Sequence, residues 1–187
     1  MNKENYKHVA VVAVSGTGKG TVSRSIRQII LELQVPVSAT TRKPRAGEEN
    51  GVHYHFYSWW KFILGILTGK FLEWNYYNGN LYGTLYSEIT NRDIPLFFDV
   101  DINGAVKLRK HLGKQILLVF LDCPIEESEK RLRGREKGKP ESFFRSRMKI
   151  GKKEILRKNE CDEIVWYGPG SDPNLKANEI ANLMLIK

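Results

Sequence analysis

A short apolar run that leads into a glycine-rich turn and then into a helical pattern is the feature that most constrains the fold. Val9 to Val14 is continuously apolar, rich in valine and bounded by Gly16, which is typical of a buried strand in a parallel sheet. From Lys19 onward apolar residues recur at three- and four-residue steps as far as Leu33, and Pro36 ends that pattern. The sequence therefore predicts a strand, a glycine loop and a helix, which form the first half of a βαβ unit.

The alternation of strands and helices continues along the chain. Pro95 to Val100 and Gln115 to Leu121 are apolar and predict two more strands, with a helix from Asn103 to His111 between them. Glu163 to Tyr167 predicts a last strand, and Pro173 to Ile186 predicts a final helix. We therefore expect an α/β core with roughly five parallel strands.

Residues 38–93 interrupt this alternation. Tyr, Trp, Asn and Gly follow one another closely there, and the only long helical pattern runs from Trp59 to Leu67. This apolar run is too short to span a bilayer, which requires about 20 apolar residues, so we expect it to be buried or to form a subunit contact. The chain of 187 residues is predicted to be one domain, with an inserted mixed α+β lobe and a core of residues 1–37, 94–124 and 160–187.

The charge balance favours an anionic partner. Lys and Arg together number 30 against 21 Asp and Glu, which gives a net charge of +9 and suits a nucleotide, a nucleic acid or a lipid headgroup. Many of these cations lie in residues 125–159, where a basic stretch precedes a helix predicted from about Ser142 to Asn159. Cys123 and Cys161 are too far apart for a disulfide framework or a zinc pattern, and the N-terminus has no export signal, so we expect a cytoplasmic protein.

The turn after the first strand has the composition of a phosphate-binding loop. Backbone amides and the helix dipole attract phosphate at such a position, glycines allow close approach, and a lysine adds charge. The strict pattern G-x-x-x-x-G-K-[ST] requires glycine where Ala13 stands and a hydroxyl where Gly20 stands, so an ordinary glycine-rich turn is the alternative. Because a strand and a helix flank the turn as the motif requires, we expect ATP phosphates to bind at Ser15, Gly16, Thr17, Gly18, Lys19, Gly20 and Thr21.

The segment that begins at Ser38 reads Ser38-Ala39-Thr40-Thr41-Arg42-Lys43-Pro44-Arg45, then Gly47-Glu48-Glu49-Asn50-Gly51 and Tyr54. It resembles the guanylate kinase signature S-x-T-T-R-x-P-R-x-G-E-x-x-G-x-x-Y. Further matches follow in order: Gly69 to Trp74, Tyr82-Gly83-Thr84, Asp99-Val100-Asp101, Asn103-Gly104-Ala105, Arg131, Arg135 and Arg147. The family's loop, similar to G-P-S-G-x-G-K-[GS]-T, tolerates glycine after the lysine, whereas Ala13 and Val14 replace its Gly-Pro. The resemblance implies a P-loop kinase core with a GMP-binding lobe at 38–93 and a helical arginine lid at 125–159.

This resemblance implies direct in-line transfer of the γ-phosphoryl of ATP to GMP, and to dGMP, with Mg²⁺. It implies that the catalytic residues are Lys19, Arg42, Arg131, Arg135 and Arg147. It implies that GMP binds to Ser38, Arg42, Arg45, Tyr54, Glu73, Tyr82, Gly83, Thr84, Asp99 and Asp101. Thr21 and Asp101 would hold the metal, partly through water, although Asp101 could instead cap the helix that follows it.

The resemblance also bears on base choice and on the third lid arginine. Guanine presents two neighbouring N–H donors, and Glu73 resembles the family's carboxylate that could accept from both, whereas adenine would leave it unpaired. Arg147 begins a pattern like the family's R-L-x-x-A-x-x-E, which ends at Glu154. Its spacing from Arg135 is one residue longer than is usual, so Arg145 is the alternative.

Three other functions fit parts of the sequence. A non-catalytic guanylate kinase-like module that binds proteins would typically have lost the loop lysine and the lid arginines, which are retained here. Another P-loop small-molecule kinase would be expected to lack the set of Ser38, Glu73 and Tyr82. A nucleic-acid binder is suggested by the net charge of +9, for which the lid already accounts in large part. We therefore expect no nucleic-acid or membrane partner, and a monomer or homodimer.

Overall fold

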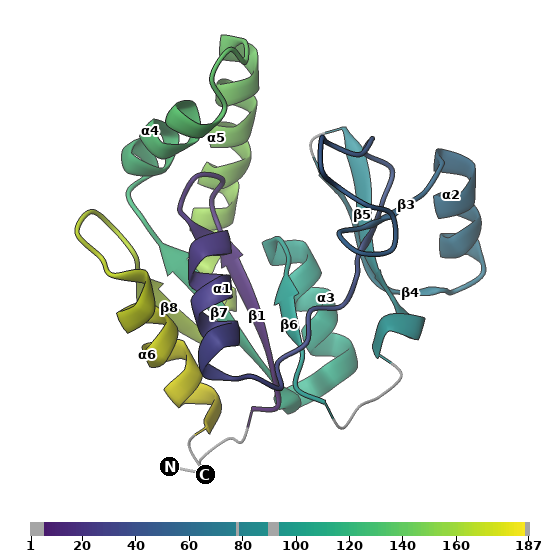
Figure 1. The fold of residues 1–187 in the computed structure, drawn as a ribbon, viewed down its shortest axis with the longest axis horizontal. Helices are drawn as coiled ribbons and strands as arrows, with labels where there is room; N and C mark the ends of the chain where they lie inside the picture. Colours follow the sequence, from purple (N-terminus) through teal and green to yellow (C-terminus); the bar gives the residue numbers. More distant parts are fainter. Residues whose placement is uncertain (1–5, 78, 90–93, 186–187) are drawn as a thin grey trace. The chain divides into compact units, whose positions relative to one another are not determined.

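The computed structural model describes residues 6–77, 79–89 and 94–185. They form two compact units, one within residues 1–34 and 95–187, called the core unit below, and one within residues 35–94, called the lobe unit. Figure 1 labels the helices and strands of both.

The core unit is built on a sheet of four parallel strands. Their order is β6 (Phe97–Asp99), β1 (His8–Ala13), β7 (Ile116–Asp122) and β8 (Glu163–Trp166). Every residue of β1 and the first six of β7 are buried, which explains why these segments are continuously apolar. The predicted α/β class with a parallel sheet is confirmed.

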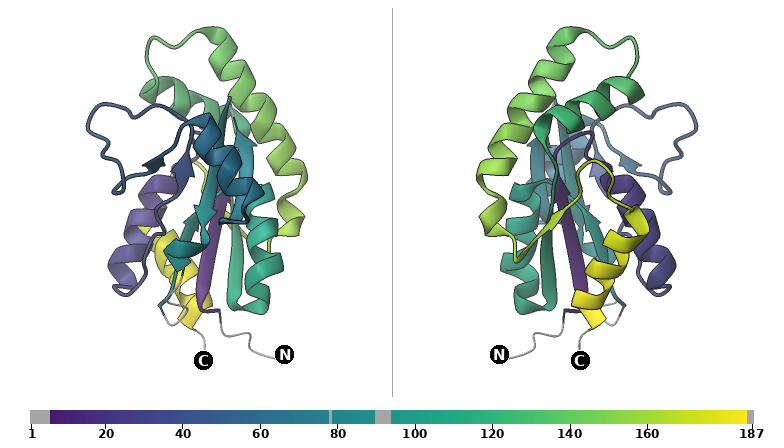
Figure 2. Two further views of the ribbon diagram at one scale, coloured as in Figure 1. Left: turned by 90° about the vertical axis from the view of Figure 1, so that its right-hand side faces the viewer. Right: turned by 90° about the vertical axis from the view of Figure 1, so that its left-hand side faces the viewer.

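Helices cover both faces of this sheet. Figure 2 shows α1 and α6 on one face and α3 and α5 on the other. The helices of the core unit are α1 (Lys19–Ile29), α3 (Ile102–Leu112), α4 (Ile125–Arg135), α5 (Glu141–Leu156) and α6 (Pro173–Leu185), with short 3₁₀ turns η2 (Gly113–Gln115) and η3 (Lys158–Glu160).

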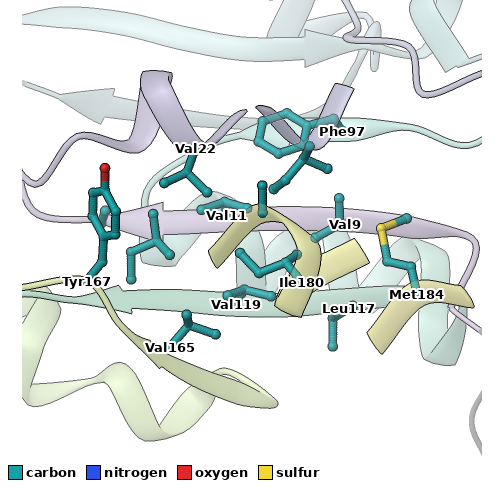
Figure 3. Packing of buried hydrophobic residues seen from close by; sticks show 14 of the residues in the cluster. Val9, Val11, Val22, Phe97, Leu117, Val119, Val165, Tyr167, Ile180 and Met184 are labelled. Carbon is teal, nitrogen blue, oxygen red and sulfur yellow. The ribbon is translucent and has the colours of Figure 1, made fainter. Parts of the chain in front are cut away.

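Side chains from alternate strand positions form the core beneath α1 and α6. Figure 3 shows Val9, Val11, Leu117, Val119 and Val165 of the strands with Ile180 and Met184 of α6. Since successive strand residues face opposite sides of a sheet, the odd-numbered residues of β1 and β7 share this face. The layer places the carboxyl ends of the strands, and the loops that follow them, at one edge.

The sheet of the lobe unit has four short strands in mixed directions. Their order is β3 (His55–Phe56), β2 (Ala39–Thr40), β5 (Asn80–Leu85) and β4 (Phe71–Tyr77). The β2–β3 pair is parallel and the other two pairs are antiparallel. The 3₁₀ turn η1 (Tyr86–Ile89) follows β5.

The predicted helix from Trp59 to Leu67 is present as α2, and it is half buried. Phe62 is fully buried and stacks on Phe71, with ring centroids 4.3 Å apart. Trp60 and Leu67 are 85% and 78% exposed. Burial therefore accounts for the apolar residues on one face of the helix, and those on the other face are exposed. None of the helices in the described ranges is both long and apolar enough to cross a membrane.

The core differs from the prediction in two details. The described residues form four strands where roughly five were expected, and beside β6 Gln34 makes one bridge only, in which Gln34 N donates to Pro95 O at 2.9 Å and Phe97 N donates to Gln34 O at 2.8 Å. Pro36 has no N–H and cannot extend this pairing. The first helix ends at Ile29 instead of continuing to Leu33, which returns to the core through a turn closed by its own N–H on Ile30 O.

The predicted helix at 142–159 begins at Glu141 and ends at Leu156. The predicted end of the last helix, Ile186, lies outside the described residues.

Candidate active site

The predicted phosphate loop joins β1 to α1, and two of its glycines are required by geometry. Gly16 and Gly18 have φ of 96° and 110°, in the left-handed region. A Cβ on Gly16 would lie 2.0 Å from Ser128 O, and one on Gly18 would lie 2.9 Å from Tyr167 Cε1. The loop is therefore enclosed by other segments of the core unit where these glycines stand.

Two side chains hold the loop from α4. Thr17 is fully buried, and its Oγ1 lies 3.0 Å from Ser128 Oγ. Arg131 donates from Nη1 to Thr17 O at 2.7 Å and from Nη2 to Gly168 O at 3.3 Å. Arg131, which the resemblance implies as a catalytic arginine, thus lies against the main chain of the loop.

The remaining loop residues lie at the start of α1. Ser15 is half-buried, while Gly20 and Thr21 are exposed in the first helical turn. Thr21 N donates to Gly18 O at 2.9 Å. In the part of the chain that the structure describes, Gly18 caps the helix without a side-chain hydrogen bond and no acidic residue stands in the first turn. The positive end of the α1 dipole is therefore uncompensated by a carboxylate there and suits an anion.

Lys19 meets the end of the neighbouring strand β6. Its Nζ lies 2.5 Å from Asp99 Oδ1 and donates to Val100 O at 3.1 Å. The Asp99 side chain is 51% exposed, so this carboxylate remains open to solvent. Asp101 accepts from Gly104 N at 2.9 Å and caps α3, which confirms the capping alternative for that residue.

A buried carboxylate to which the sequence analysis gave no role lies on α5. Glu154 is 5% exposed, and burial raises its pKa to about 7. The charges of Lys19 and Arg147 lower that pKa, whereas the charge of Asp101 raises it. The sequence marked this residue, because Glu154 ends the R-L-x-x-A-x-x-E-like pattern. The pattern did not indicate that the side chain is buried.

The other predicted arginines differ in their surroundings. Arg135 and Arg145 point outward, with side chains 65% and 80% exposed. Arg147 is half-buried and its guanidinium carbon lies 5.3 Å from the centroid of the Phe143 ring. Of the two candidates for the third arginine, Arg147 is the one whose charge lowers the pKa of the buried Glu154.

Arg133, which the sequence analysis did not single out, ties α4 to α5. Its guanidinium donates to Glu129 of α4 at 2.6 Å and to Glu141 of α5 at 2.7 Å. It also lies 4.4 Å from the centroid of the Phe144 ring. Arg133 therefore links α4 to α5 through ion pairs and an aromatic contact.

In the lobe unit, Arg42 is held by a carboxylate that the sequence analysis did not assign. Its Nη1 and Nη2 donate to the two oxygens of Glu48, each at 2.9 Å. This forked pair raises the pKa of Arg42 and lowers the pKa of Glu48. The guanidinium carbon also lies 5.3 Å from the Tyr54 ring centroid and 5.7 Å from that of Phe56. The cation is thereby oriented before any ligand binds.

Glu73 is buried within the lobe sheet. It is 6% exposed, and its Oε1 accepts from Thr84 N at 3.0 Å and from Thr84 Oγ1 at 2.8 Å. Glu73 and Thr84 are register partners across β4 and β5, just after a bulge at Phe71. A Cβ on Gly83 would lie 2.8 Å from Glu73 O, so this position has no room for a side chain.

The remaining predicted residues of the lobe lie on the same unit. The Tyr54 and Tyr82 rings meet edge to face, with centroids 6.2 Å apart. Ser38 is half-buried, and its carbonyl accepts from His55 N at 2.9 Å. Arg45 is exposed, and its backbone N donates to Glu48 at 2.7 Å. The lobe unit thus brings Arg42, Tyr54 and Tyr82 into one cluster and pairs Glu73 with Thr84.

Comparisons with known proteins agree with these features. A sequence profile of the family described as guanylate kinase matches residues 5–166. A guanylate kinase from Chlorobaculum tepidum is 40% identical over 157 residues, which cover 82% of this chain and 80% of that protein. A guanylate kinase from Mycoplasmopsis synoviae is 33% identical over 195 aligned positions, which cover 98% of this chain and 96% of that protein.

Solved structures support the same fold. The crystal structure of guanylate kinase from Anaplasma phagocytophilum matches with a TM-score of 0.73 at 22% identity, covering 97% of this chain and 86% of that one. A gluconokinase from Sinorhizobium meliloti matches with a TM-score of 0.53 at 12% identity, covering 98% of this chain and 93% of that one. At these identities the structures show a shared fold alone. The profile and the curated relatives go further, and by them the chain belongs to the guanylate kinase family.

Proposed function

We infer that this protein transfers the γ-phosphoryl group of ATP to GMP and so produces ADP and GDP. Family membership over residues 5–166 and relatives with this activity in their names support the reaction. We further propose that dGMP is accepted.

ATP would bind through the phosphate loop of the core unit. Phosphoryl transfer brings two anions together, so catalysis consists mainly of alignment and charge neutralisation. The Lys19 ammonium and the amides at the start of α1 supply positive charge for the phosphates, and Lys19 would exchange Asp99 for a phosphate oxygen on binding. Arg131 would hold the loop in shape through Thr17 O, and Arg135 and Arg147 would add charge at the transferring group.

The residues present fit a Mg²⁺ ion carried with ATP. Mg²⁺ keeps several waters and is usually bound by one or two carboxylates together with substrate phosphates. Thr21 is exposed in the first turn of α1, and the Asp99 and Asp101 carboxylates follow β6. Thr21 and Asp101 would hold the ion, partly through water, and the ion would neutralise charge on the phosphates.

GMP would bind to the lobe unit. Arg42, with Arg45 and the Tyr54 and Tyr82 hydroxyls, would bind its phosphate, because a guanidinium fork matches phosphate oxygens. Ser38, Gly83 and Thr84 would contact the base. Asp99 and Asp101 would complete the network on the GMP side.

The observation that carries the choice of GMP is the buried Glu73 carboxylate. Since Glu73 Oε1 is already occupied by Thr84, the group is positioned before a base arrives. A guanine edge offers two donors to a carboxylate, whereas adenine presents an acceptor in place of one of them and would face this buried charge unfavourably, at a cost of about 2–5 kcal/mol.

A coupled assay that compares GMP, dGMP, AMP and UMP as acceptors tests this function. The parent protein should use GMP and dGMP and discriminate against AMP by at least about tenfold. Glu73→Gln should lower kcat/KM for GMP and leave KM for ATP unchanged, because ATP is bound by the core unit. Glu49→Gln removes an exposed carboxylate of the same unit and serves as the matched control. Equal use of AMP by the parent protein would show that Glu73 does not select the base.

A further inference from the structure

The Glu154 carboxylate is the one buried acid of the core unit that the reaction described above does not use, among the residues that the structure describes. It is 5% exposed, and within the described chain its Oε2 has no hydrogen-bond partner. Leaving a buried polar atom unpaired costs about 1–3 kcal/mol, and more for a charged group. A position that carries such a cost calls for a functional explanation.

The helix that carries Glu154 lies directly on the phosphate loop. A Cβ on Gly151, one turn before Glu154, would lie 2.5 Å from Val14 Cγ1. Only a residue without a side chain allows α5 to approach the start of the loop this closely. Arg147, Gly151 and Glu154 are spaced i, i+4 and i+7 and share one face of α5. This face is therefore the one turned to the loop.

Two cations act electrostatically on the Glu154 carboxylate. The charges of Lys19 on α1 and Arg147 on α5 both favour its ionised form, and the charge of Asp101 at the start of α3 opposes it. Lys19 itself contacts the exposed Asp99, which is free to release it to a phosphate. The Glu154 side chain, in contrast, is buried and has no such access to solvent.

We propose that Glu154 is a positioning residue, whose buried carboxylate on α5 holds the Lys19 ammonium at the phosphate loop for the phosphates of ATP. The proposal rests on the proposed role of Lys19 in binding ATP. Asp99 would then be the contact that the ammonium exchanges for phosphate, and Glu154 a fixed buried charge that acts on the ammonium before and after the exchange.

The direction in which nucleotide binding changes distinguishes this role from that of a carboxylate that merely lies near the site. A carboxylate that only lay near the site would repel the phosphates, so its neutralisation would tighten nucleotide binding. A carboxylate that positions Lys19 has the opposite effect, because the ammonium loses its place when the charge is removed. Glu154→Gln keeps the shape of the side chain and removes only its charge.

The test is the dissociation constant for ADP, measured by isothermal titration calorimetry on the full chain. Glu154→Gln should raise it about tenfold or more, while KM for GMP stays within about twofold of the parent value. Glu154→Asp, which retains the charge, should bind ADP more tightly than Glu154→Gln does. Glu179→Gln removes an exposed carboxylate on α6 and should leave ADP binding unchanged. ADP binding that is unchanged or tighter in Glu154→Gln overturns the proposal.

A second background tests whether Glu154 acts through Lys19. Lys19→Met should itself weaken ADP binding, and Glu154→Gln added to it should cause no further loss. A full additional loss would mean that Glu154 supports the fold and does not position the ammonium, which overturns the proposal. If Lys19→Met leaves ADP binding intact, the proposed role of Lys19 fails. If Lys19→Met weakens binding and Glu154→Gln alone does not, the role of Glu154 fails by itself.

Discussion

Replacing Glu154 by Gln should make the protein more stable at alkaline pH than its parent. Burial raises the pKa of Glu154 from 4.5 to about 7 in the folded protein, whereas the unfolded chain keeps an ordinary glutamate. Between these values the unfolded state has released its proton and the folded state still holds it. The free energy of unfolding therefore falls as the pH rises from about 4.5 to about 7.

The size of this effect follows from the difference between the two pKa values. Each pKa unit corresponds to about 1.4 kcal/mol, so the ionised Glu154 lowers the free energy of unfolding by about 3 kcal/mol above pH 7. Gln resembles the protonated acid in shape and cannot ionise. The variant should match the parent to within about 1 kcal/mol at pH 5 and exceed it by about 3 kcal/mol at pH 8.

Urea unfolding followed by circular dichroism at pH 5, 6, 7 and 8 measures this difference. Other titrating groups are common to both proteins and cancel in the comparison. Glu179→Gln, on the surface of α6, should differ from the parent by the same small amount at every pH. A difference between Glu154→Gln and the parent that stayed constant from pH 5 to pH 8 would refute the reasoning.

Three further predictions follow from the two units. Gly16→Ala should lower stability and ADP affinity, because φ is 96° and the new Cβ meets Ser128 O at 2.0 Å, whereas Gly20→Ala, with nothing within 4 Å, should leave the melting temperature unchanged or raise it. Phe62→Ala should cost about 3–5 kcal/mol in urea unfolding, while Leu67→Ala on the exposed face of α2 should stay within about 0.5 kcal/mol. Arg42→Lys keeps the charge but loses the fork to Glu48, so KM for GMP should rise about tenfold with KM for ATP unchanged, and an unchanged KM for GMP would contradict the assignment.

The core could be predicted from the sequence because its signals are local. Adjacent residues predict both the strand at Val9–Val14 and the turn after it, and the structure has β1 and the loop at these positions. The end of α1 could not be predicted in this way. Leu33 has helical spacing from Ile26, yet it reaches the core through a turn after Ile30, and an apolar period does not distinguish these two routes.

In the lobe unit, the surroundings of the site residues depend on contacts between segments that are separated in the sequence, and a local pattern does not predict such contacts. The motif pointed to Glu73, but its burial results from the bulge in β4 and the register that sets it opposite Thr84. The forked pair of Arg42 with Glu48 was likewise not foreseen, although both residues belong to the signature, because it depends on how the loop between them folds back. The burial of Glu154 depends on the approach of α5 to the loop, which no local pattern encodes.

The contact between Val14 and Gly151 also limits how this enzyme can be recombined with its relatives. The chain places valine where the family's loop has proline, and the methyl group of that valine occupies the space that any side chain at position 151 would need. A chimera that imports only the α4–α5 segment, or only the loop, would combine residues at positions 14 and 151 whose sizes are not matched. Exchanges of these parts should therefore be made as a matched set, with both positions transferred together.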